Sequence, residues 1–348
     1  MIIEEITESF IRLNSKGTRL NSTELAIARL AFQWPGAIVN EFEITLKDYA
    51  NTDYDLEINV LVRFFLIIGK MKNGGNEKAD SIFNLDNQDL MATWKKSKKA
   101  FNGAITFLKN NAGIESSKWL TSQYIITPLA FFFYKKDKQK ITENEIGGLM
   151  LWFFITTIYM RLTGRMSNLD KDIKAIGSDE SIANLIKNLY EDVPSFNVTP
   201  EMIRGIYSRS NLMPLLRVIL SYRDAKDFFT GISIKTNNIG YENQIESHHI
   251  FPKSLLKKQG ISTKLFDDIT NIAFISQKVN NQISNSEPYD YLKSIDEKRL
   301  ESQLIPTYKE LWKLPRFNDF CEERRKLIAK AINDFLDEQL HKYSAKSD

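Results

Sequence analysis

The segment Ile245–Lys253, IESHHIFPK, carries two of the three histidines of the chain and decides the fold that we expect around it. Its short alternation of apolar and polar residues favours a β-strand. Adjacent residues on a strand point to opposite faces, so a regular strand would bury one of His248 and His249 and expose the other. Pro252 lacks the N–H group that strand pairing needs, so we expect a loop to begin here. Functional groups often lie at such strand ends.

Two asparagines follow the histidine pair in a regular order. The segment 271–276 (NIAFIS) has the composition of a second short strand, and 277–284 (QKVNNQIS) can begin a helix. Asn271 opens this strand, and Asn280 lies nine residues later, in the helix. A histidine pair or an asparagine-rich loop alone is a common surface feature, but this combination is far more specific.

The combination resembles the HNH endonucleases, which have the ββα-metal fold. HHIFP resembles their first histidine signature, Asn271 their middle asparagine, and Asn280 their last metal-ligand position, with Asn in place of the His of the family name. The resemblance implies that His249 is the general base and that His248 and Asn280 hold a divalent metal. It also implies that Asn271 holds the loop and orients His249.

These roles suit the hydrolysis of a phosphodiester bond. A neutral imidazole can take a proton from water near neutral pH, and a divalent cation can stabilise the charge on the phosphate. We expect Mg²⁺ or Mn²⁺, and a site with one imidazole also suits Ni²⁺ or Zn²⁺. The surrounding lysines are candidate phosphate contacts, with solubility as the alternative reading: Lys253, Lys257, Lys258 and Lys278, with Lys264 nearby.

The remainder of the sequence predicts a mainly α protein. Apolar residues recur at helical spacing in the windows 56–71, 87–110, 120–135, 143–162, 180–190 and 200–222, and again over 320–340. We therefore expect a helical domain over residues 1–230. We expect an HNH nuclease domain with a C-terminal helix over residues 231–348.

A second resemblance extends beyond the histidine motif. FIRLNSKGTRL (10–20) resembles the FxRxNxxGxxL signature of GmrSD-like proteins. These proteins are bacterial modification-dependent restriction enzymes and related phage-defence nucleases. RLTGR (161–165) and ISNSEPYDYL (283–292) resemble the helical parts of the family more loosely. The family's Asp-Gly-Gln-Gln-Arg motif for nucleotide hydrolysis is absent, so the resemblance does not extend NTPase activity to this chain. The chain then looks like the C-terminal part of such a protein, working with an NTPase-type partner domain or as a homo-oligomer. The segment NSKGT can be interpreted in two ways. One is a turn before a helix, and the other is a contact of Arg12, Asn14 or Lys16 with a nucleotide or DNA.

Composition sets looser bounds on function. The formal net charge of +3 permits a nucleic-acid partner without requiring one, and the lysine runs in 94–99 and 134–140 are usually solvated faces. Cys321 is the only cysteine, which excludes an internal disulfide and a cysteine zinc cage. The N-terminus lacks the pattern of a signal peptide, and the apolar windows are too short for a bilayer. We expect a soluble, cytoplasmic protein with no membrane partner.

Three functions remain open from the sequence. The first is a metal-dependent DNA endonuclease that restricts foreign or modified DNA. The second is a DNA-binding regulatory module or partner subunit, whose HNH site is inactive or gated by a missing NTPase domain. The third is a helical partner protein in which the HNH fold is only structural, and a lack of retention on heparin or DNA columns would favour it.

Overall fold

The chain folds into two compact units, described here by a computed structural model over residues 22–72, 86–137, 139–207, 210, 212–235 and 244–345. The first unit ends at Asp192 and the second runs from Val193 to Ala345. The fold is mainly α with one small two-stranded sheet, as the sequence predicts. The segment 10–20, with Arg12, Asn14 and Lys16, lies outside the described residues.

The division between the units differs from the boundary that we expected at residue 230. Residues 193–230 belong to the second unit. The reason is packing, because two helices from this stretch, α10 (Pro200–Ile203) and α11 (Met213–Tyr222), contact the long C-terminal helix α17 (Phe317–Ser344).

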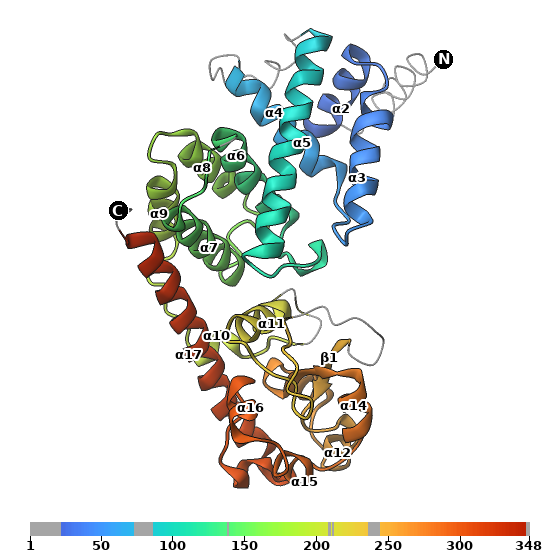
Figure 1. The fold of residues 1–348 in the computed structure, drawn as a ribbon, viewed down its shortest axis with the longest axis vertical. Helices are drawn as coiled ribbons and strands as arrows, with labels where there is room; N and C mark the ends of the chain where they lie inside the picture. Colours follow the sequence, from blue (N-terminus) through green and yellow to red (C-terminus); the bar gives the residue numbers. More distant parts are fainter. Residues whose placement is uncertain are drawn as a thin grey trace. The chain divides into compact units, whose positions relative to one another are not determined.

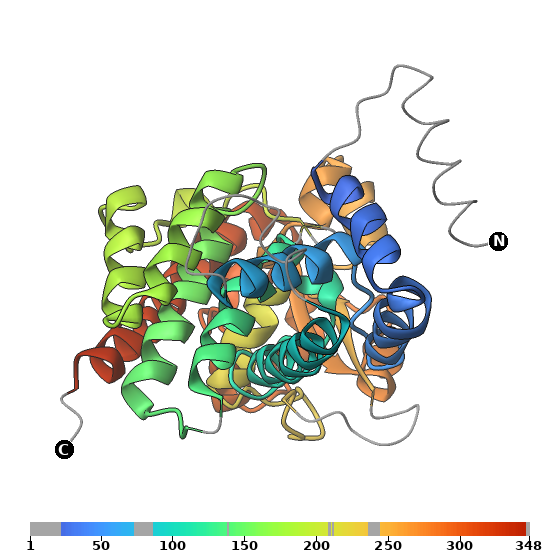
Figure 2. The same cartoon turned by 90° about the horizontal axis from the view of Figure 1, so that it is seen from above.

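The first unit is built from helices alone in its described part (Figure 1). They are α2 (Ser22–Gln33), η1 (Ala37–Phe42), α3 (Glu43–Ala50), α4 (Ile58–Lys72), α5 (Asn87–Asn110), η3 (Ser117–Trp119), η4 (Gln123–Ile125), α6 (Ile126–Lys136), α7 (Glu143–Ile158), α8 (Met166–Gly177) and α9 (Ser181–Asp192). The capping signals are local, since Asp86 accepts the Asp89 N–H at the start of α5 and Thr142 forms a capping box with Glu145 at α7. Figure 2 shows the green helices α6 to α9 side by side.

The RLTGR segment supplies a buried ion-pair centre to this unit. Arg161 Nη1 lies 2.9 Å from Asp172 Oδ2 and its Nη2 lies 2.6 Å from Asp192 Oδ2, while Trp152 Nε1 donates to Asp172 Oδ2 over 2.9 Å. Because Arg161 and Asp172 are almost fully buried, each charge depends on the other, and these residues serve the fold.

The two lysine runs also serve the first unit, at least in part. Lys98 and Lys99 form ion pairs with Asp48 and Asp137, and Lys135 Nζ donates to the carbonyl oxygens of Ile176, Gly177 and Ser178 at the end of α8. A cation at a helix C-terminus satisfies carbonyl groups that have no helical partner. Lys98, Lys99 and Lys135 thus make contacts within the first unit, in addition to the solvated surface expected from the sequence.

The second unit contains the sheet and shorter helices. Its described elements are α10, α11, β1 (Ile245–His249), α12 (Lys253–Lys258), α13 (Thr263–Phe266), η6 (Ile269–Asn271), β2 (Ile272–Ser276), α14 (Gln277–Ile283), α15 (Pro288–Leu292), α16 (Glu297–Ser302), η7 (Lys309–Trp312), η8 (Leu314–Arg316) and α17. Strands β1 and β2 pair antiparallel, with Ile245 opposite Ser276 and His249 opposite Ile272. The two strands and the following helix that we predicted for residues 245–283 are present, but the expected loop contains α12, α13 and η6, and Asn271 ends η6 instead of opening β2.

The expected helix 200–222 is wrong as a single element. Helix α10 starts at Pro200 as predicted, but it ends at Ile203, and Gly205 follows with φ of +79°, outside the helical region. The chain then pairs with the loop before β2, since Tyr207 forms a β-bridge with Asp268 and Ile269 N donates to Ile206 O over 2.8 Å. This tertiary pairing overrides the local helical pattern.

Side chains occupy the outer edge of β2. Gln303 is fully buried, and its amide exchanges two hydrogen bonds with the backbone N–H and C=O of Phe274. Further along the strand, Ser276 N donates to Asp227 Oδ2 over 2.7 Å. These side chains satisfy backbone groups that a third strand would otherwise satisfy.

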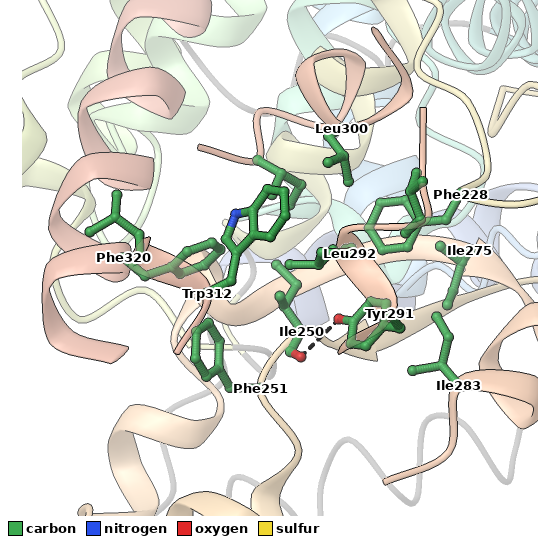
Figure 3. Packing of buried hydrophobic residues seen from close by; sticks show 14 of the residues in the cluster. Phe228, Ile250, Phe251, Ile275, Ile283, Tyr291, Leu292, Leu300, Trp312 and Phe320 are labelled. Atoms are coloured by element: carbon green, nitrogen blue, oxygen red, sulfur yellow. Dashed lines mark hydrogen bonds between the residues drawn. The ribbon is translucent and has the colours of Figure 1, made fainter. Parts of the chain in front are cut away.

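The core of the second unit packs around β2, α15, η7 and α17 (Figure 3). Phe251 contacts the rings of Phe317 and Phe320 at centroid distances of 5.2 and 4.9 Å, in edge-on geometry. Phe251 comes from the histidine motif itself. Burial of IFP thus anchors the end of β1 in the core.

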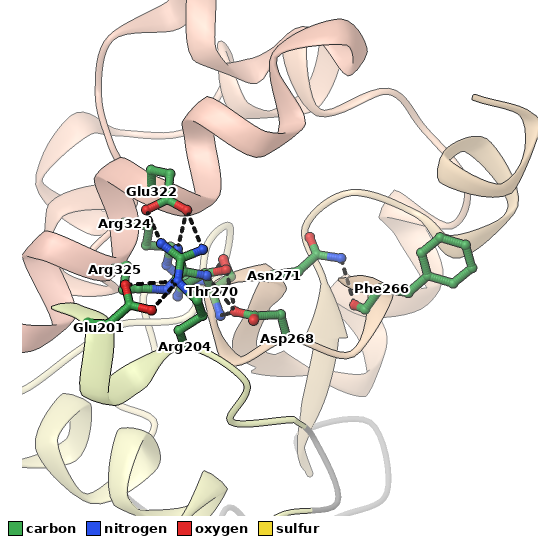
Figure 4. Close-up of polar contacts among 9 residues, drawn as sticks. All are labelled: Glu201, Arg204, Phe266, Asp268, Thr270, Asn271, Glu322, Arg324 and Arg325. Atoms are coloured by element: carbon green, nitrogen blue, oxygen red, sulfur yellow. Dashed lines mark hydrogen bonds and ion pairs between the residues drawn. The ribbon is translucent and has the colours of Figure 1, made fainter. Parts of the chain in front are cut away.

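Charged groups hold the loop before β2 against α17 (Figure 4). Arg325 Nη1 lies 2.8 Å from Glu322 Oε1, and its Nη2 lies 3.5 Å from Asp268 Oδ1. Arg324 Nη1 donates to the Thr270 carbonyl over 2.8 Å. Burial lowers the pKa of Arg324 to about 9, so its guanidinium stays charged at neutral pH and remains a donor.

Candidate functional site

His248 lies on the buried face of β1 and contacts the helix after β2. Its Nδ1 is 2.8 Å from Asn280 Oδ1, and its Nε2 is 3.4 Å from the hydroxyl of Tyr291 in α15. Burial lowers the pKa of His248 to about 4, so the ring is neutral at pH 7. A metal-ligating histidine must be neutral, and this one is.

The hydrogen bonds around His248 show how its ring could serve as a metal ligand. The single hydroxyl proton of Tyr291 is donated to the Ile250 carbonyl over 2.8 Å (Figure 3), which leaves its oxygen able to accept from His248 Nε2 when that nitrogen carries a proton. Asn280 Nδ2 donates to Glu246 Oε2 over 3.0 Å, which turns the amide oxygen toward His248. An amide oxygen can only accept, so at 2.8 Å His248 Nδ1 is the donor to Asn280 Oδ1 when no metal is bound. A cation held by Nδ1 and Oδ1 would take the place of that proton, and Tyr291 could then accept from Nε2–H.

The donor set fits a divalent ion that keeps much of its water. Two ligands at right angles with bonds of about 2.1 Å lie about 3 Å apart, and His248 Nδ1 and Asn280 Oδ1 are 2.8 Å apart. In the described ranges no group of three or more His, Cys, Asp or Glu side chains is arranged to hold a metal. An ion here would therefore complete its shell with water and phosphate oxygens, which suits Mg²⁺ or Mn²⁺ and permits Ni²⁺ or Zn²⁺.

His249 points to the other face of β1 and is partly exposed. Its Nε2 lies 2.9 Å from Asp267 Oδ1, and Lys253 Nζ lies 2.7 Å from the same oxygen. Burial lowers the pKa of His249, with Asp267 opposing the shift, so the neutral form that can accept a proton dominates at pH 7. Partial burial favours a higher pKa for Asp267, but its bonds to Lys253 and His249 hold that pKa below its usual value.

Asn271 is fully buried and binds the histidine loop, as expected from the resemblance. Its Oδ1 accepts the Phe251 N–H over 2.8 Å, and its Nδ2 donates to the carbonyl oxygens of Phe251 and Phe266 over 3.1 and 2.9 Å. The Asn271 carbonyl also accepts the Ile250 N–H over 2.9 Å. Asn271 thus fixes the chain directly after His249, although it has no contact with the imidazole itself.

The candidate phosphate contacts differ in their surroundings. Lys257 and Lys258 lie exposed in the last turn of α12, and Lys278 lies exposed near the start of α14. Lys253, at the start of α12, is instead paired with Asp267. The structure brings His248 to Asn280 and His249 to Asp267, while the lysines are spread over two helices.

Three residues of this site were not predicted from the sequence. Asp267 and Glu246 were not singled out, and Tyr291 lies within ISNSEPYDYL, which was named only for its resemblance. Each joins the site through a tertiary contact with a residue 18 to 43 positions away. A buried tyrosine on a short helix carries no local signal for such a contact, so none of the three could be assigned from spacing alone.

Comparison with known proteins gives one distant relative. No family model matches the chain. The chain is 24% identical over 316 residues to the uncharacterized protein MJ0686 of Methanocaldococcus jannaschii, with 84% of this chain and 50% of that protein covered. The chain thus spans about half the length of the curated relative that it matches. Across the described part of the chain, no helix has both the length and the apolar character needed to cross a bilayer.

Proposed function

We propose that the chain is a metal-dependent DNA endonuclease that hydrolyses phosphodiester bonds in foreign or modified DNA in the cytoplasm. The observation that carries this proposal is the pairing of His248 Nδ1 with Asn280 Oδ1 at 2.8 Å, with a second histidine next to it in sequence. The side formed by His248 and Asn280 suits a hydrated cation, and on the other side His249 is suited to accept a proton.

In this proposal each residue has a separate task. His249 accepts the proton of the attacking water at the ring nitrogen that does not face Asp267. His248 and Asn280 hold the divalent ion, which when bound stabilises the charge that develops on the phosphate. Asn271 keeps the backbone after His249 in place through its bonds to Phe251. Exposed lysines supply contacts to the DNA backbone that do not depend on sequence.

A plasmid-cleavage assay tests the proposal. Purified protein is incubated with supercoiled, linear and modified DNA in the presence of Mg²⁺, Mn²⁺, Ni²⁺ or Zn²⁺, or of EDTA. We expect nicked or linear product only with a metal, and a loss of about 10²–10⁴-fold in His249→Ala, the range for a general base. Glu297→Gln, an exposed change on α16, is the matched control. A wild type that leaves every substrate intact with every metal contradicts an active endonuclease.

A second candidate is a DNA-binding module whose site is inactive or gated by a partner. The observation that favours it is the length of the matched relative, which is twice the part that this chain covers. An NTPase-type partner or a second copy of the chain would then complete the enzyme. Salt-dependent DNA binding without cleavage, and recovery of cleavage when the rest of such a protein is added, would support gating. Binding without recovery would support an inactive site.

A further inference from the structure

Asp267 joins two residues of the candidate site through a single oxygen atom. Its Oδ1 is 2.9 Å from His249 Nε2 and 2.7 Å from Lys253 Nζ. An ammonium group can only donate and an ionised carboxylate can only accept. Asp267 Oδ1 is therefore an acceptor on both sides, and the ring nitrogen that faces it must carry the proton.

We propose that Asp267 is a positioning residue, which holds His249 in the Nε2–H tautomer so that Nδ1 presents the lone pair to the attacking water. The catalytic role of this contact rests on the proposed function, whereas the tautomer itself follows from the contacts of Asp267 alone. A histidine with the proton on the wrong nitrogen cannot act as a base without first rearranging. A carboxylate that fixes the tautomer therefore raises the fraction of molecules ready to react.

The backbone on both sides of Asp267 is fixed, which a positioning residue requires. On one side, the carbonyl of Phe266 accepts the amide of Asn271 over 2.9 Å (Figure 4). On the other, Asp268 accepts the Thr270 N–H over 3.0 Å and lies 3.5 Å from Arg325. Asp268 and Thr270 are buried, so the loop cannot shift without breaking these bonds.

Lys253 takes a different role in this arrangement from the phosphate contact expected from the sequence. Its ammonium group neutralises Asp267 and holds the carboxylate oxygen at the His249 ring. Lys257 and Lys258, on the same helix, point their charges into solvent. The two roles give different kinetics, because a phosphate contact changes substrate affinity and a positioning contact changes the chemical step.

Nitrogen-15 NMR of the full chain tests the tautomer without any substrate. The chain has three histidines, so uniformly ¹⁵N-labelled protein gives three ring systems, assigned with His248→Gln and His341→Gln. At pH 8 without metal, we expect His249 to show one tautomer with a protected Nε2–H proton. In Asp267→Ala we expect that proton to exchange rapidly and the ring to sample both tautomers. A wild-type His249 that is protonated at Nδ1 overturns the proposal.

Single-turnover kinetics provide the second readout. We expect Asp267→Ala and Lys253→Met to lower the cleavage rate by about 10- to 100-fold with little change in DNA affinity, less than the loss of the base itself. In a His249→Ala background Asp267→Ala should cost nothing further, because both act through one ring. Lys298→Met on α16 is the charge-matched control.

The two proposals fail in different ways. A wild type with the expected tautomer and no cleavage contradicts the endonuclease and leaves the positioning geometry standing. Additive losses in the double variant, or a Lys253→Met variant that weakens DNA binding at an unchanged rate, contradict the positioning role.

Discussion

His248 Nδ1 and Asn280 Oδ1 lie 2.8 Å apart, although 32 positions separate the two residues in the chain. This approach follows from the pairing of β1 with β2 and from α14, which begins directly after β2. The two histidines of the motif therefore face different partners, and their roles can be separated by experiment.

Metal affinity should separate the two histidines. His248→Ala removes a ligand, so we expect weaker Mn²⁺ binding by calorimetry and partial recovery of cleavage at high metal concentration. His249→Ala should bind Mn²⁺ like the wild type and should not recover. Equal affinity and equal loss of rate in both variants would contradict the assignment.

Tyr291 should matter through its hydroxyl group alone. Tyr291→Phe keeps the ring that packs edge-on against His248, but it removes the donor to Ile250 and the oxygen that would accept from Nε2–H once a metal occupies Nδ1. We expect metal affinity to fall by about 10- to 100-fold, the range for partners of metal ligands. Tyr289→Phe, on the same helix with its side chain partly exposed, is the matched control and should bind metal like the wild type. Equal affinity in the two variants would mean that Tyr291 does not orient the ligand.

We expect Asn271 to contribute mainly to the folding stability of the second unit and not directly to the reaction. Asn271→Ala leaves the Phe251 N–H and the Phe266 carbonyl buried without this partner, at a cost of about 1–3 kcal/mol for each unsatisfied group. We expect a clearly lower midpoint in urea unfolding, followed by circular dichroism. The exposed Asn281→Ala on α14 should change the midpoint little. A stable, inactive Asn271→Ala would instead indicate a direct role in the reaction.

The buried His248 should make the second unit sensitive to mild acid. Its pKa is 6.5 in an unfolded chain and about 4 in the fold, so the unfolded state takes up the proton first as pH falls. The contribution is constant above pH 6.5, is lost between pH 6.5 and 4, and levels off below that. The full loss is about 3 kcal/mol. Urea titrations in EDTA should show this window in the difference between wild type and His248→Gln. A difference that does not change with pH would contradict the buried, neutral ring.

Lys257 and Lys258 should strengthen DNA affinity through counterion release. Replacing both with alanine should make the slope of log affinity against log salt shallower by about 0.9 for each phosphate group that a lysine no longer neutralises. Fluorescence anisotropy on duplex DNA with metal replaced by EDTA measures this without cleavage. The pair Lys298 and Lys309, also exposed in the second unit, provides the control. An unchanged slope would leave both lysines as solubility residues.

The sequence predicted those elements whose cause is local. The amphipathic pattern of 87–110 gives α5 with the expected bounds, and Pro200 opens α10 because proline at the first helical position costs no hydrogen bond. The helical pattern over 204–212 gave a wrong prediction. Gly205 has a non-helical backbone conformation, and Tyr207 forms a β-bridge with Asp268, a tertiary contact that the local pattern does not reveal. Tertiary packing against α17 also explains why residues 193–230 belong to the second unit and not to the first.

The residues of the candidate site were likewise predictable only where their grouping follows from the order of elements along the chain. His248, His249, Asn271 and Asn280 belong to one short segment with a regular order of elements, so their grouping follows from chain order. Asp267 and Tyr291 do not, because each reaches a histidine only after a loop or helix has folded back. Side-chain partners of this kind depend on the three-dimensional arrangement, and acidic or aromatic residues are too frequent to mark them.

The closed edge of β2 limits the sheet to two strands. An unpaired strand edge is a template onto which the strand of another molecule can add, and this is a common origin of aggregation. Gln303 and Asp227 occupy the hydrogen-bonding groups of Phe274 and Ser276 from within the same molecule. A foreign strand would first have to displace two buried side chains, so this edge of the sheet is protected against self-association during folding and at high concentration.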